Sequence, residues 1–374
     1  MTQMDTARRI SQLRELMAFL RFDAVILRNN PDLAWLTGFE GVFDDEEAHT
    51  AVVTADGLWL HTDSRYYGSF KERQAPDDPW QIDREHERHP AWAIRVAREA
   101  GARCLAVEDT LSLGFYDDLR AAHWRPGFPG QFERLRGNIC EMRSVKDAGE
   151  LERLRRAQQI SDDAIEHLLG FIEAGQTERE VRAELELYML THGASGLSFD
   201  TIVASGPNGA NPHARPSERV LADGDMVVID FGACYGDYHA DMTRTVCVGT
   251  PGDEERRVYD VVRRAHEEAA AFLRAGRKGT EVHAVAARVI EEAGYGPYFD
   301  HGLGHGVGLE IHERPNLNTR WDRPIPEGAV VTVEPGIYLP GRFGVRIEDC
   351  GVVTETGYES FTRLSHDLPM VGAR

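Results

Sequence analysis

The sequence predicts an α/β protein with a smaller N-terminal α/β domain, residues 1–140, and a larger C-terminal domain, residues 141–374. Three observations support this fold class. The length of 374 residues suits two domains of ordinary size. Helical and β-like periodicities alternate along the chain. After residue 144, an order of two helices followed by a strand pair occurs twice.

The N-terminal domain is expected to begin with a helix, because residues 6–20 have helical spacing of apolar side chains. Short β-like runs follow at residues 23–27, 51–54, 58–61 and 103–107. Ala55-Asp56-Gly57 is a turn signal between the second run and the third. The Pro- and Gly-rich segment 125–130 is expected to be a loop, and the domain boundary is placed after it.

The larger domain is expected to begin with a long amphipathic helix, and Thr177 with Glu180 forms a capping box that begins a second helix. The predicted elements of the first half are helices at 151–172 and 177–189 and strands at 199–204, 226–233 and 238–248. Those of the second half are helices at 254–275 and 280–293, the latter also begun by a threonine, and strands at 329–338 and 345–354. This order predicts an internal duplication, although unrelated α/β chains alternate in a similar way.

Charge and composition exclude several classes of protein. The 42 Lys and Arg residues against 62 Asp and Glu give a net charge of −20, which disfavours nucleic-acid binding. No apolar run approaches the roughly 20 residues of a membrane-spanning helix, and no secretory signal is recognised. The five cysteines are scattered without a CxxC pair, so we expect a cytoplasmic protein. They are Cys104, Cys140, Cys234, Cys247 and Cys350.

Two carboxylates occupy the first predicted strand pair. If Tyr235-Gly236 forms a two-residue turn, Asp230 and Asp241 lie directly opposite each other. Like charges in this position destabilise a sheet, and Asp is a poor strand former. Asp230 also follows the apolar run 226–229, where an unpaired carboxylate would be costly to bury. A bound cation is the simplest compensation.

The second strand pair repeats this arrangement. With Pro340-Gly341 in the turn, Glu334 and Glu348 also lie opposite each other, and the two hairpins could meet about a pseudo-twofold axis. A single carboxylate is more often solvated, or paired with an arginine such as Arg244 or Arg346. Two matching pairs favour a shared cation site.

Histidines are concentrated near the second acidic pair. His301, His305 and His312 lie in a glycine-rich segment, and His213 lies in the polar loop 205–216. A neutral imidazole can bind a metal or carry a proton, although a lone histidine is more often a simple core or surface residue. The clustering favours a functional interpretation for the first three.

With these motifs, the sequence resembles the pita-bread metallopeptidases, in particular the branch of Xaa-Pro aminopeptidase (aminopeptidase P) and prolidase. The similar segments are Val-Ile-Asp230-Phe-Gly, Asp241-Met-Thr-Arg, His301-Gly-Leu-Gly-His305-Gly-Val-Gly with His312-Glu313, Val-Glu334-Pro-Gly-Ile-Tyr338 and Gly-Val-Arg346-Ile-Glu348-Asp. They span most of residues 144–374. The resemblance implies a pita-bread fold with pseudo-twofold halves, preceded by a creatinase-like N-terminal domain.

The resemblance also implies two divalent metal ions held by five ligands. Asp241 and Glu348 would bridge the two metals. Asp230 would complete the shell of one metal, and His305 with Glu334 the shell of the other. This oxygen-rich set favours Mn(II), with Co(II), Fe(II) or Zn(II) as alternatives.

The implied reaction is hydrolysis of the Xaa-Pro bond at the N-terminus of short proline-containing peptides by a hydroxide that bridges the two metals. Glu334 is the expected general base. Three further histidines are expected around the substrate: His213, His301 and His312. The first and third would hydrogen-bond the oxyanion or the scissile amide, and the second would position groups or shuttle protons. Arg346 would hold a ligand carboxylate and Tyr338 in place.

Two members of the branch differ in how they treat the C-terminus of the substrate. Prolidases of this kind carry an arginine a few positions after the His-Glu pair, whereas that position here holds Asn316, with Arg314 and Arg320 nearby. We therefore expect an Xaa-Pro aminopeptidase, with an Xaa-Pro dipeptidase as the alternative. A non-catalytic peptide-binding module is disfavoured by the complete ligand set. The branch also implies a homodimer, for which Trp35, Phe39, Phe43 and Trp59 are candidate contacts, although core packing is their commoner use.

Overall fold

The computed structural model describes residues 2, 4–44, 46–124 and 131–372, and the chain divides between Arg143 and Ser144 into two compact units. The smaller unit is Met4–Arg143, and the larger unit holds the chain from Ser144 onward. The loop expected at 125–130 lies outside the described residues. Within them, we find no helix that combines the length and the apolar character needed to cross a bilayer.

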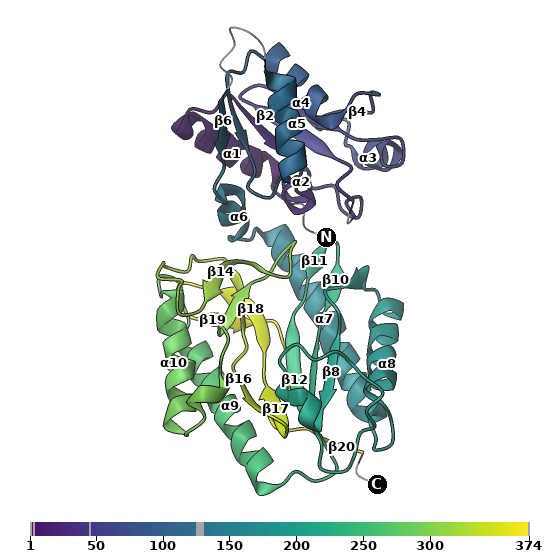
Figure 1. Cartoon of the computed structure of the whole chain (residues 1–374), viewed down its shortest axis with the longest axis vertical. Helices are drawn as coiled ribbons and strands as arrows, with labels where there is room; N and C mark the ends of the chain where they lie inside the picture. Colours follow the sequence, from purple (N-terminus) through teal and green to yellow (C-terminus); the bar gives the residue numbers. More distant parts are fainter. Residues whose placement is uncertain (1, 3, 45, 125–130, 373–374) are drawn as a thin grey trace. The chain divides into compact units, whose positions relative to one another are not determined.

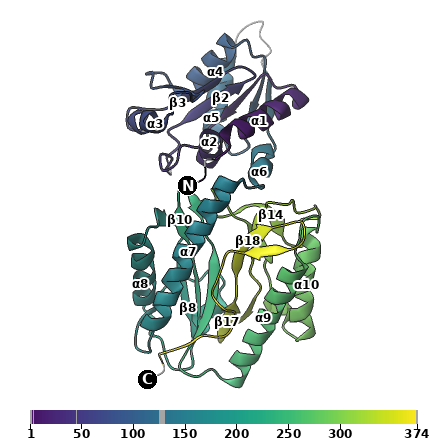
Figure 2. The same ribbon diagram turned by 180° about the vertical axis from the view of Figure 1, so that it is seen from behind.

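The smaller unit is a six-stranded sheet with the strand order β4-β3-β2-β1-β5-β6. Figures 1 and 2 show α5 on one face of the sheet and α1 on the other. The fully buried, apolar run of β1 lies at the centre, where it pairs antiparallel with β2 and parallel with β5. Trp35 and Phe39 are buried within this unit.

Five elements of this unit confirm the sequence-based expectations: α1 (Thr6–Leu20), β1 (Ala24–Leu27), β2 (Thr50–Thr54), β3 (Leu58–His61) and β5 (Cys104–Val107). The remaining elements are α2 (Asn30–Thr37), α3 (Tyr67–Arg73), β4 (Gln81–Asp83), α4 (His89–Glu99), α5 (Leu113–His123), β6 (Gln131–Arg134) and α6 (Asn138–Arg143).

The larger unit consists of two halves with the same order of elements, which confirms the predicted duplication. The first half contains α7 (Ala148–Phe171), α8 (Glu178–Thr191), β8 (Ile202–Ser205), β9 (Met226–Phe231) and β12 (Met242–Val248). The second contains α9 (Asp253–Phe272), α10 (Gly279–Glu292), β13 (Gly304–Gly306), β15 (Val330–Val333) and β18 (Asp349–Val353). Each helix pair packs its apolar face against the strands of its own half, and the strands of both halves lie between the two helix pairs (Figure 2).

Shorter elements complete this unit: β7 (Gly196–Leu197), η1 (Gly206–Ala210), β10 (Ala233–Tyr235), β11 (Tyr238–His239), η2 (Gly296–Tyr298), β14 (Glu313–Leu317), β16 (Gly336–Leu339), β17 (Phe343–Arg346), β19 (Tyr358–Ser360) and β20 (Met370–Val371). The two main sheets have the orders β20-β12-β9-β8 and β14-β13-β15-β18-β19. Strand β20, from the end of the described chain, pairs in parallel with β12 of the first half.

The starts of the two second helices differ. At α8 the predicted capping box is present, because Thr177 Oγ1 accepts from the Glu180 N–H at 3.2 Å and Glu180 Oε2 accepts from the Thr177 N–H at 2.7 Å. The expectation that a threonine begins α10 is wrong. Its N-cap is Lys278, whose backbone N–H donates to Glu281 Oε2 at 3.0 Å, so Thr280 already lies within the first turn.

The register of the first hairpin differs from the predicted one. Tyr235 pairs with Tyr238, so the turn is Gly236-Asp237, and both residues have a left-handed φ of 57° and 66°. A turn with two positive φ angles matches the twist of a hairpin. Asp230 therefore lies opposite Thr243 and not opposite Asp241.

The second hairpin has the predicted register. Val333 pairs with Asp349 and Gly336 pairs with Arg346, so Glu334 and Glu348 face each other between these pairs. An isolated bridge between Thr243 and Glu348, with the Glu348 N–H donating to the Thr243 carbonyl at 3.1 Å, joins the two halves.

Candidate active site

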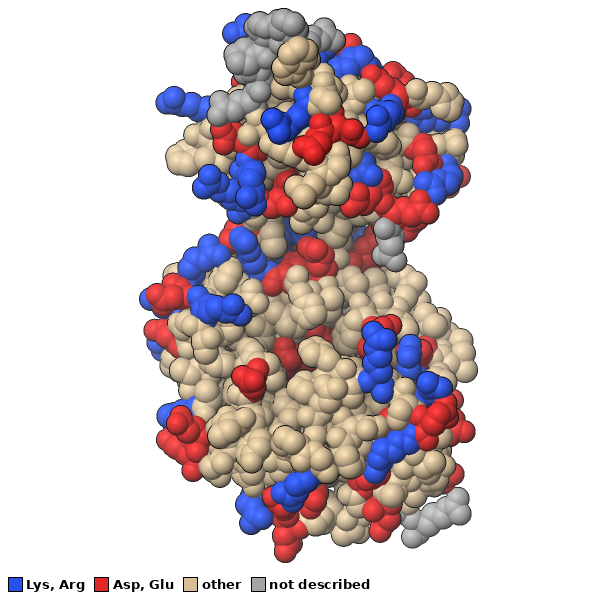
Figure 3. Space-filling model, in the orientation of Figure 1, with Lys and Arg blue, Asp and Glu red and all other residues tan. Residues whose placement is uncertain are grey.

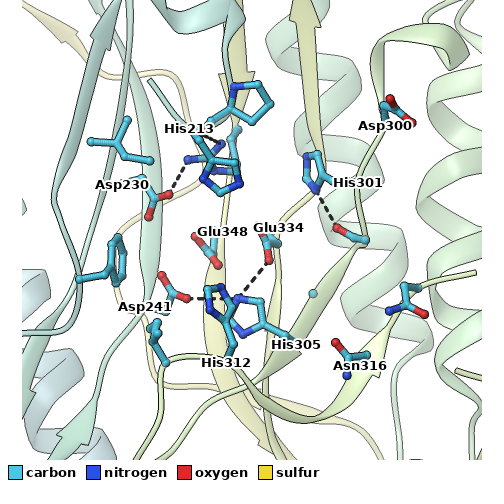
Figure 4. A pocket seen from close by; sticks show the side chains of 18 of the residues that line it. His213, Asp230, Asp241, Asp300, His301, His305, His312, Asn316, Glu334 and Glu348 are labelled. Atoms are coloured by element: carbon cyan, nitrogen blue, oxygen red, sulfur yellow. Dashed lines mark hydrogen bonds and ion pairs between the residues drawn. The ribbon is translucent and has the colours of Figure 1, made fainter. Parts of the chain in front are cut away.

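The four carboxylates come from equivalent places in the two halves. Asp230 lies on β9, and Glu334 follows β15 directly. Asp241 immediately precedes β12, and Glu348 immediately precedes β18. All four line one cavity of about 760 Å³ in the larger unit, and their carboxylates face a common space (Figure 4). On the face drawn in Figure 3, acidic atoms are visible inside a hollow of this unit that is otherwise surrounded by uncharged side chains.

An imidazole from the glycine-rich segment completes this cluster. His305 lies on β13, and its Nδ1 is 3.1 Å from the Gly306 carbonyl oxygen. Its Nε2 is 3.5 Å from Asp241 Oδ2 and 3.4 Å from Glu334 Oε1. Asp241, His305 and Glu348 each offer a ligand atom within 4.8 Å of the others. The Nε2 atom of His305 is therefore close to the carboxylates of Asp241 and Glu334, with Glu348 also nearby.

Among the described lining residues, the four carboxylates share one arginine, Arg346. Burial, and then the neighbouring carboxylates, raise the pKa values of Asp241 and Glu348 well above the usual range. Burial also raises the pKa of Glu334 to about 8. Asp230 Oδ1 is buried and has no hydrogen-bond partner among the described residues. Oxygen donors arranged in this way, together with one imidazole, fit a pair of divalent cations.

Two threonines hold the acids, and the sequence analysis did not identify them. Thr243 Oγ1 donates to Glu348 Oε2 at 2.7 Å, and Thr332 Oγ1 donates to Glu334 Oε1 at 3.2 Å. A signal was available, because each threonine lies two positions from a carboxylate of its own strand pair. Residues two apart share one face of a strand.

The two arginines considered as partners of the acids have different contacts. Arg346 donates to Asp230 Oδ2 at 2.5 Å and to Tyr338 Oη at 2.7 Å. Arg244 instead donates to Asp349 Oδ1 at 2.9 Å and to the Glu348 carbonyl at 2.6 Å. Among the described contacts, the other three carboxylates have no hydrogen bond from a guanidinium side chain.

The three remaining predicted histidines line the same cavity (Figure 4). His213 is exposed in the loop after η1, and the ring of His312 lies 4.4 Å from that of His305. His301 is packed against Tyr338, and burial lowers the pKa of His301 to about 4. All ten predicted site residues thus surround one cavity.

The wall of the cavity contains residues that the sequence analysis did not single out. They are Phe199, Asp200, Ile202, Pro212, Asp300, Ile311 and Asn318. Asn316 also lines the cavity, whereas Arg314 and Arg320 are not among its described lining residues. Within that described lining, Arg346 is the single arginine or lysine. The wall therefore combines apolar side chains with amides and further acids.

Comparison with known proteins gives similarity over both units. Residues 152–355 match metallopeptidase family M24, and residues 9–145 match the creatinase/prolidase N-terminal domain. The Xaa-Pro dipeptidase of Pyrococcus horikoshii is 33% identical over 365 residues, which cover 96% of this chain and 98% of that protein.

Two solved structures resemble the chain over nearly its whole length. The Xaa-Pro dipeptidase from Bacillus anthracis has a TM-score of 0.91 and 36% identity, covering 98% of this chain and 100% of that one. The X-Pro aminopeptidase from Thermotoga maritima has a TM-score of 0.87 and 36% identity, covering 97% of this chain and 99% of that one.

Proposed function

Because the chain belongs to metallopeptidase family M24 and carries its creatinase/prolidase N-terminal domain, we propose that it is a metal-dependent Xaa-Pro dipeptidase. The observation that carries this proposal is the convergence of Asp230, Asp241, Glu334 and Glu348 with His305 in one cavity. The names of its relatives favour the dipeptidase over the aminopeptidase that the sequence alone suggested.

The five donors would hold two divalent metal ions, and the hard, oxygen-rich donor set favours Mn(II). When bound, such a pair polarises the peptide carbonyl and makes a water molecule acidic near neutral pH. Glu334 is the proposed proton acceptor. Its Oε1 accepts a hydrogen bond from Thr332 Oγ1, and the divalent ions would favour the ionised form of its carboxylate, which is the form that accepts a proton.

The surrounding residues would position the substrate. His213 and His312 face the cavity from opposite sides and would each donate an N–H toward the scissile carbonyl oxygen, where negative charge develops. The nitrogen of the scissile Xaa-Pro bond is the proline ring nitrogen and bears no hydrogen, so the site needs no acceptor for an N–H at this position. His301 would be neutral and would hold the ring of Tyr338 in position. Arg346 would hold Asp230 and Tyr338 in position by donating a hydrogen bond to each. Phe199 and Ile202 offer an apolar wall for the substrate.

One observation favours a second candidate, the Xaa-Pro aminopeptidase acting on longer peptides. A dipeptidase must hold the free C-terminal carboxylate of its substrate, and a charged hydrogen bond from arginine is the usual means. Here Asn316 lines the cavity, and the only arginine or lysine in the described lining, Arg346, is already bound to Asp230 and Tyr338.

The decisive assay compares Leu-Pro with Leu-Pro-Ala in the presence of added Mn²⁺, with metal content measured on the same sample. We expect the enzyme to cleave the dipeptide Leu-Pro with a higher kcat/KM than the tripeptide Leu-Pro-Ala. Glu334→Gln should lower kcat by about 10²–10⁴-fold, whereas the exposed Glu327→Gln should leave it unchanged. Metal-loaded protein that cleaves neither peptide would exclude the proposal.

Asn316→Arg separates the two candidate functions. An added guanidinium near the substrate carboxylate should raise kcat/KM for Leu-Pro by about tenfold if dipeptides bind in this cavity. The amidated dipeptide, which has no carboxylate, is the matched control and should gain nothing. Higher kcat/KM for Leu-Pro-Ala than for Leu-Pro in the unmodified enzyme would favour the aminopeptidase.

The family resemblance further supports a homodimer, which light scattering on the purified protein would test. We also propose a cytoplasmic location. Its support is that the five cysteines are scattered along the sequence without a CxxC pair, a pattern typical of proteins of a reducing compartment.

A further inference from the structure

The larger unit contains a second cluster of metal-binding side chains, outside the active-site cavity. His266 lies on α9, Asp349 is the first residue of β18, and His366 lies in the segment between β19 and β20. One ring nitrogen of each histidine and one carboxylate oxygen all lie within 4.8 Å of one another. None of the three is among the described residues that line the cavity.

The distances suit one small cation. Asp349 Oδ2 is 2.9 Å from His366 Nε2 and 3.6 Å from His266 Nε2. The two imidazole rings are 4.4 Å apart and inclined at 64°, so they do not stack. Ligand atoms that share a tetrahedral Zn²⁺ at roughly 2.0–2.1 Å lie about 3.3 Å from each other. The observed separations lie on both sides of that value.

The ring nitrogens of His266 are not satisfied by hydrogen bonds within the described structure. It is 1% exposed, and within the described structure neither of its ring nitrogens has a hydrogen-bond partner. An imidazole needs a partner for its N–H and another for its lone pair, and buried polar groups almost always have one. A simple hydrogen bond between His366 and Asp349 leaves His266 unexplained, whereas a cation between the three would use its Nε2 lone pair.

The surroundings orient the carboxylate and leave a route to solvent. Asp349 Oδ1 accepts from Arg244 Nη2 at 2.9 Å, so the carboxylate presents its other oxygen to both histidines. Arg244 also donates to the carbonyl of Leu364 at 2.8 Å, which holds the segment that carries His366. The His366 side chain is 25% exposed, whereas the other two are almost completely buried. Metal sites typically have ligands that are oriented by further hydrogen bonds, and one side that an ion can reach from solvent.

We propose that His266, Asp349 and His366 form a binding site for one divalent transition-metal ion of the zinc type, separate from the catalytic pair. Two imidazoles and one carboxylate are ligands that Zn²⁺ prefers, with water in the fourth position. The ion would join α9, β18 and the segment before β20. None of the three residues is among those described as lining the substrate cavity, so we assign this ion no part in the peptidase reaction.

The test counts zinc on the full chain after treatment with EDTA, addition of excess Zn²⁺ and gel filtration. Wild-type protein should bind one more zinc ion per chain than His366→Ala. His366→Cys, which restores a zinc ligand, should recover that ion. His86→Ala, at an exposed histidine of the smaller unit, should match the wild type.

A second measurement on the wild type does not depend on the folding of any variant. An anomalous difference map at the zinc edge should show a peak between the three side chains in addition to the density at the catalytic acids. The proposal is wrong if crystals grown with Zn²⁺ show no such peak. It is equally wrong if His366→Ala binds as much zinc as the wild type, or if His366→Cys binds as little as His366→Ala.

Discussion

At the scale of single residues, Arg346 links the parts of the active site that come from different strands. It is 3% exposed, and its guanidinium contacts Asp230, Tyr338 and Thr243 at the same time. A planar fork can bind several acceptors in fixed directions, whereas the ammonium of lysine is a single point charge. Arg346 therefore sets the direction in which Asp230 presents its free oxygen.

Replacement of this arginine tests the link. Arg346→Lys should keep the positive charge but lose the geometry, and we expect a 10–100-fold loss in kcat or in metal affinity. Arg342→Lys is the matched control, because Arg342 lies on the same hairpin, is exposed, and pairs with Glu254. Steady-state kinetics and metal titration measure both quantities. Equal activity in the two variants would show that Arg346 has no positioning role.

The identity of the acids was predictable at this scale, but their supports were not. Asp230, Asp241, Glu334 and Glu348 stand out because each adjoins an apolar strand where a carboxylate is costly. The hydroxyls of Thr243 and Thr332 carry no such conflict, because threonine is a common strand residue. The contact of Thr243 with Glu348 depends on how the two halves meet, which a single sequence does not show. The spacing of Thr332 and Glu334 by two residues is a signal, but many strands share it.

At the scale of elements, the site depends on strands that approach closely at glycines. A Cβ atom on Gly304 of β13 would lie 2.1 Å from the carbonyl oxygen of Thr332, which is backbone and cannot move aside. The same approach sets the position of His305, whose N–H donates to Thr332 Oγ1 at 3.1 Å. The glycine is therefore required for the geometry of the site.

Gly304→Ala should lower the free energy of unfolding by about 1–3 kcal/mol through overpacking and should also reduce activity. Gly170→Ala in α7 is the control: a Cβ there meets no atom within 4 Å, and alanine should stabilise the helix by about 0.5–1 kcal/mol. Urea denaturation of both variants gives the two values. A neutral effect of Gly304→Ala would mean that the strands separate easily.

The two hairpins also show where prediction of register succeeds. Gly341 has a φ of 73°, and the Pro-Gly signal identified the centre of the second turn. In the first turn the left-handed residues are Gly236 and Asp237, and aspartate at positive φ is rarer than glycine. A shift of the turn by one residue moves every pairing in the hairpin, which is why Asp230 met Thr243 instead of Asp241.

At the scale of the whole molecule, the smaller unit should lose stability in acid. Burial lowers the pKa values of His49 and His89 in the smaller unit to about 4, from a usual value near 6.5. The unfolded chain then binds more protons than the folded one, so the stability that these histidines contribute above pH 6.5 is lost as the pH falls toward 4. Each histidine contributes on the order of 3 kcal/mol at most.

One acid of the same unit opposes this effect. Burial raises the pKa of Glu108 to about 7, so protonation of Glu108 stabilises the fold as the pH falls. Because two histidines act against one carboxylate, we expect a net loss of stability between pH 6.5 and 4. Five of the six tryptophans belong to this unit, so intrinsic fluorescence reports its unfolding: Trp35, Trp59, Trp80, Trp92 and Trp124.

A substitution separates this cause from general acid sensitivity. His49→Phe cannot be protonated, and it places a ring among the aromatic neighbours Phe43 and Phe70. Its acid midpoint should move to lower pH, whereas His86→Phe, at an exposed position, should leave the midpoint where it is. If both variants unfold at the pH of the wild type, the buried histidine does not control the transition.

The pairing of β20 with β12 has a consequence for the order in which the protein is made. Met370 and Val371 cover the edge of a sheet whose other strands end at Val248. More than a hundred intervening residues must leave the ribosome before that edge can be closed. The half that is translated earlier therefore waits with open backbone groups until Met370 and Val371 have been synthesised, and its completion is coupled to the synthesis of the second half.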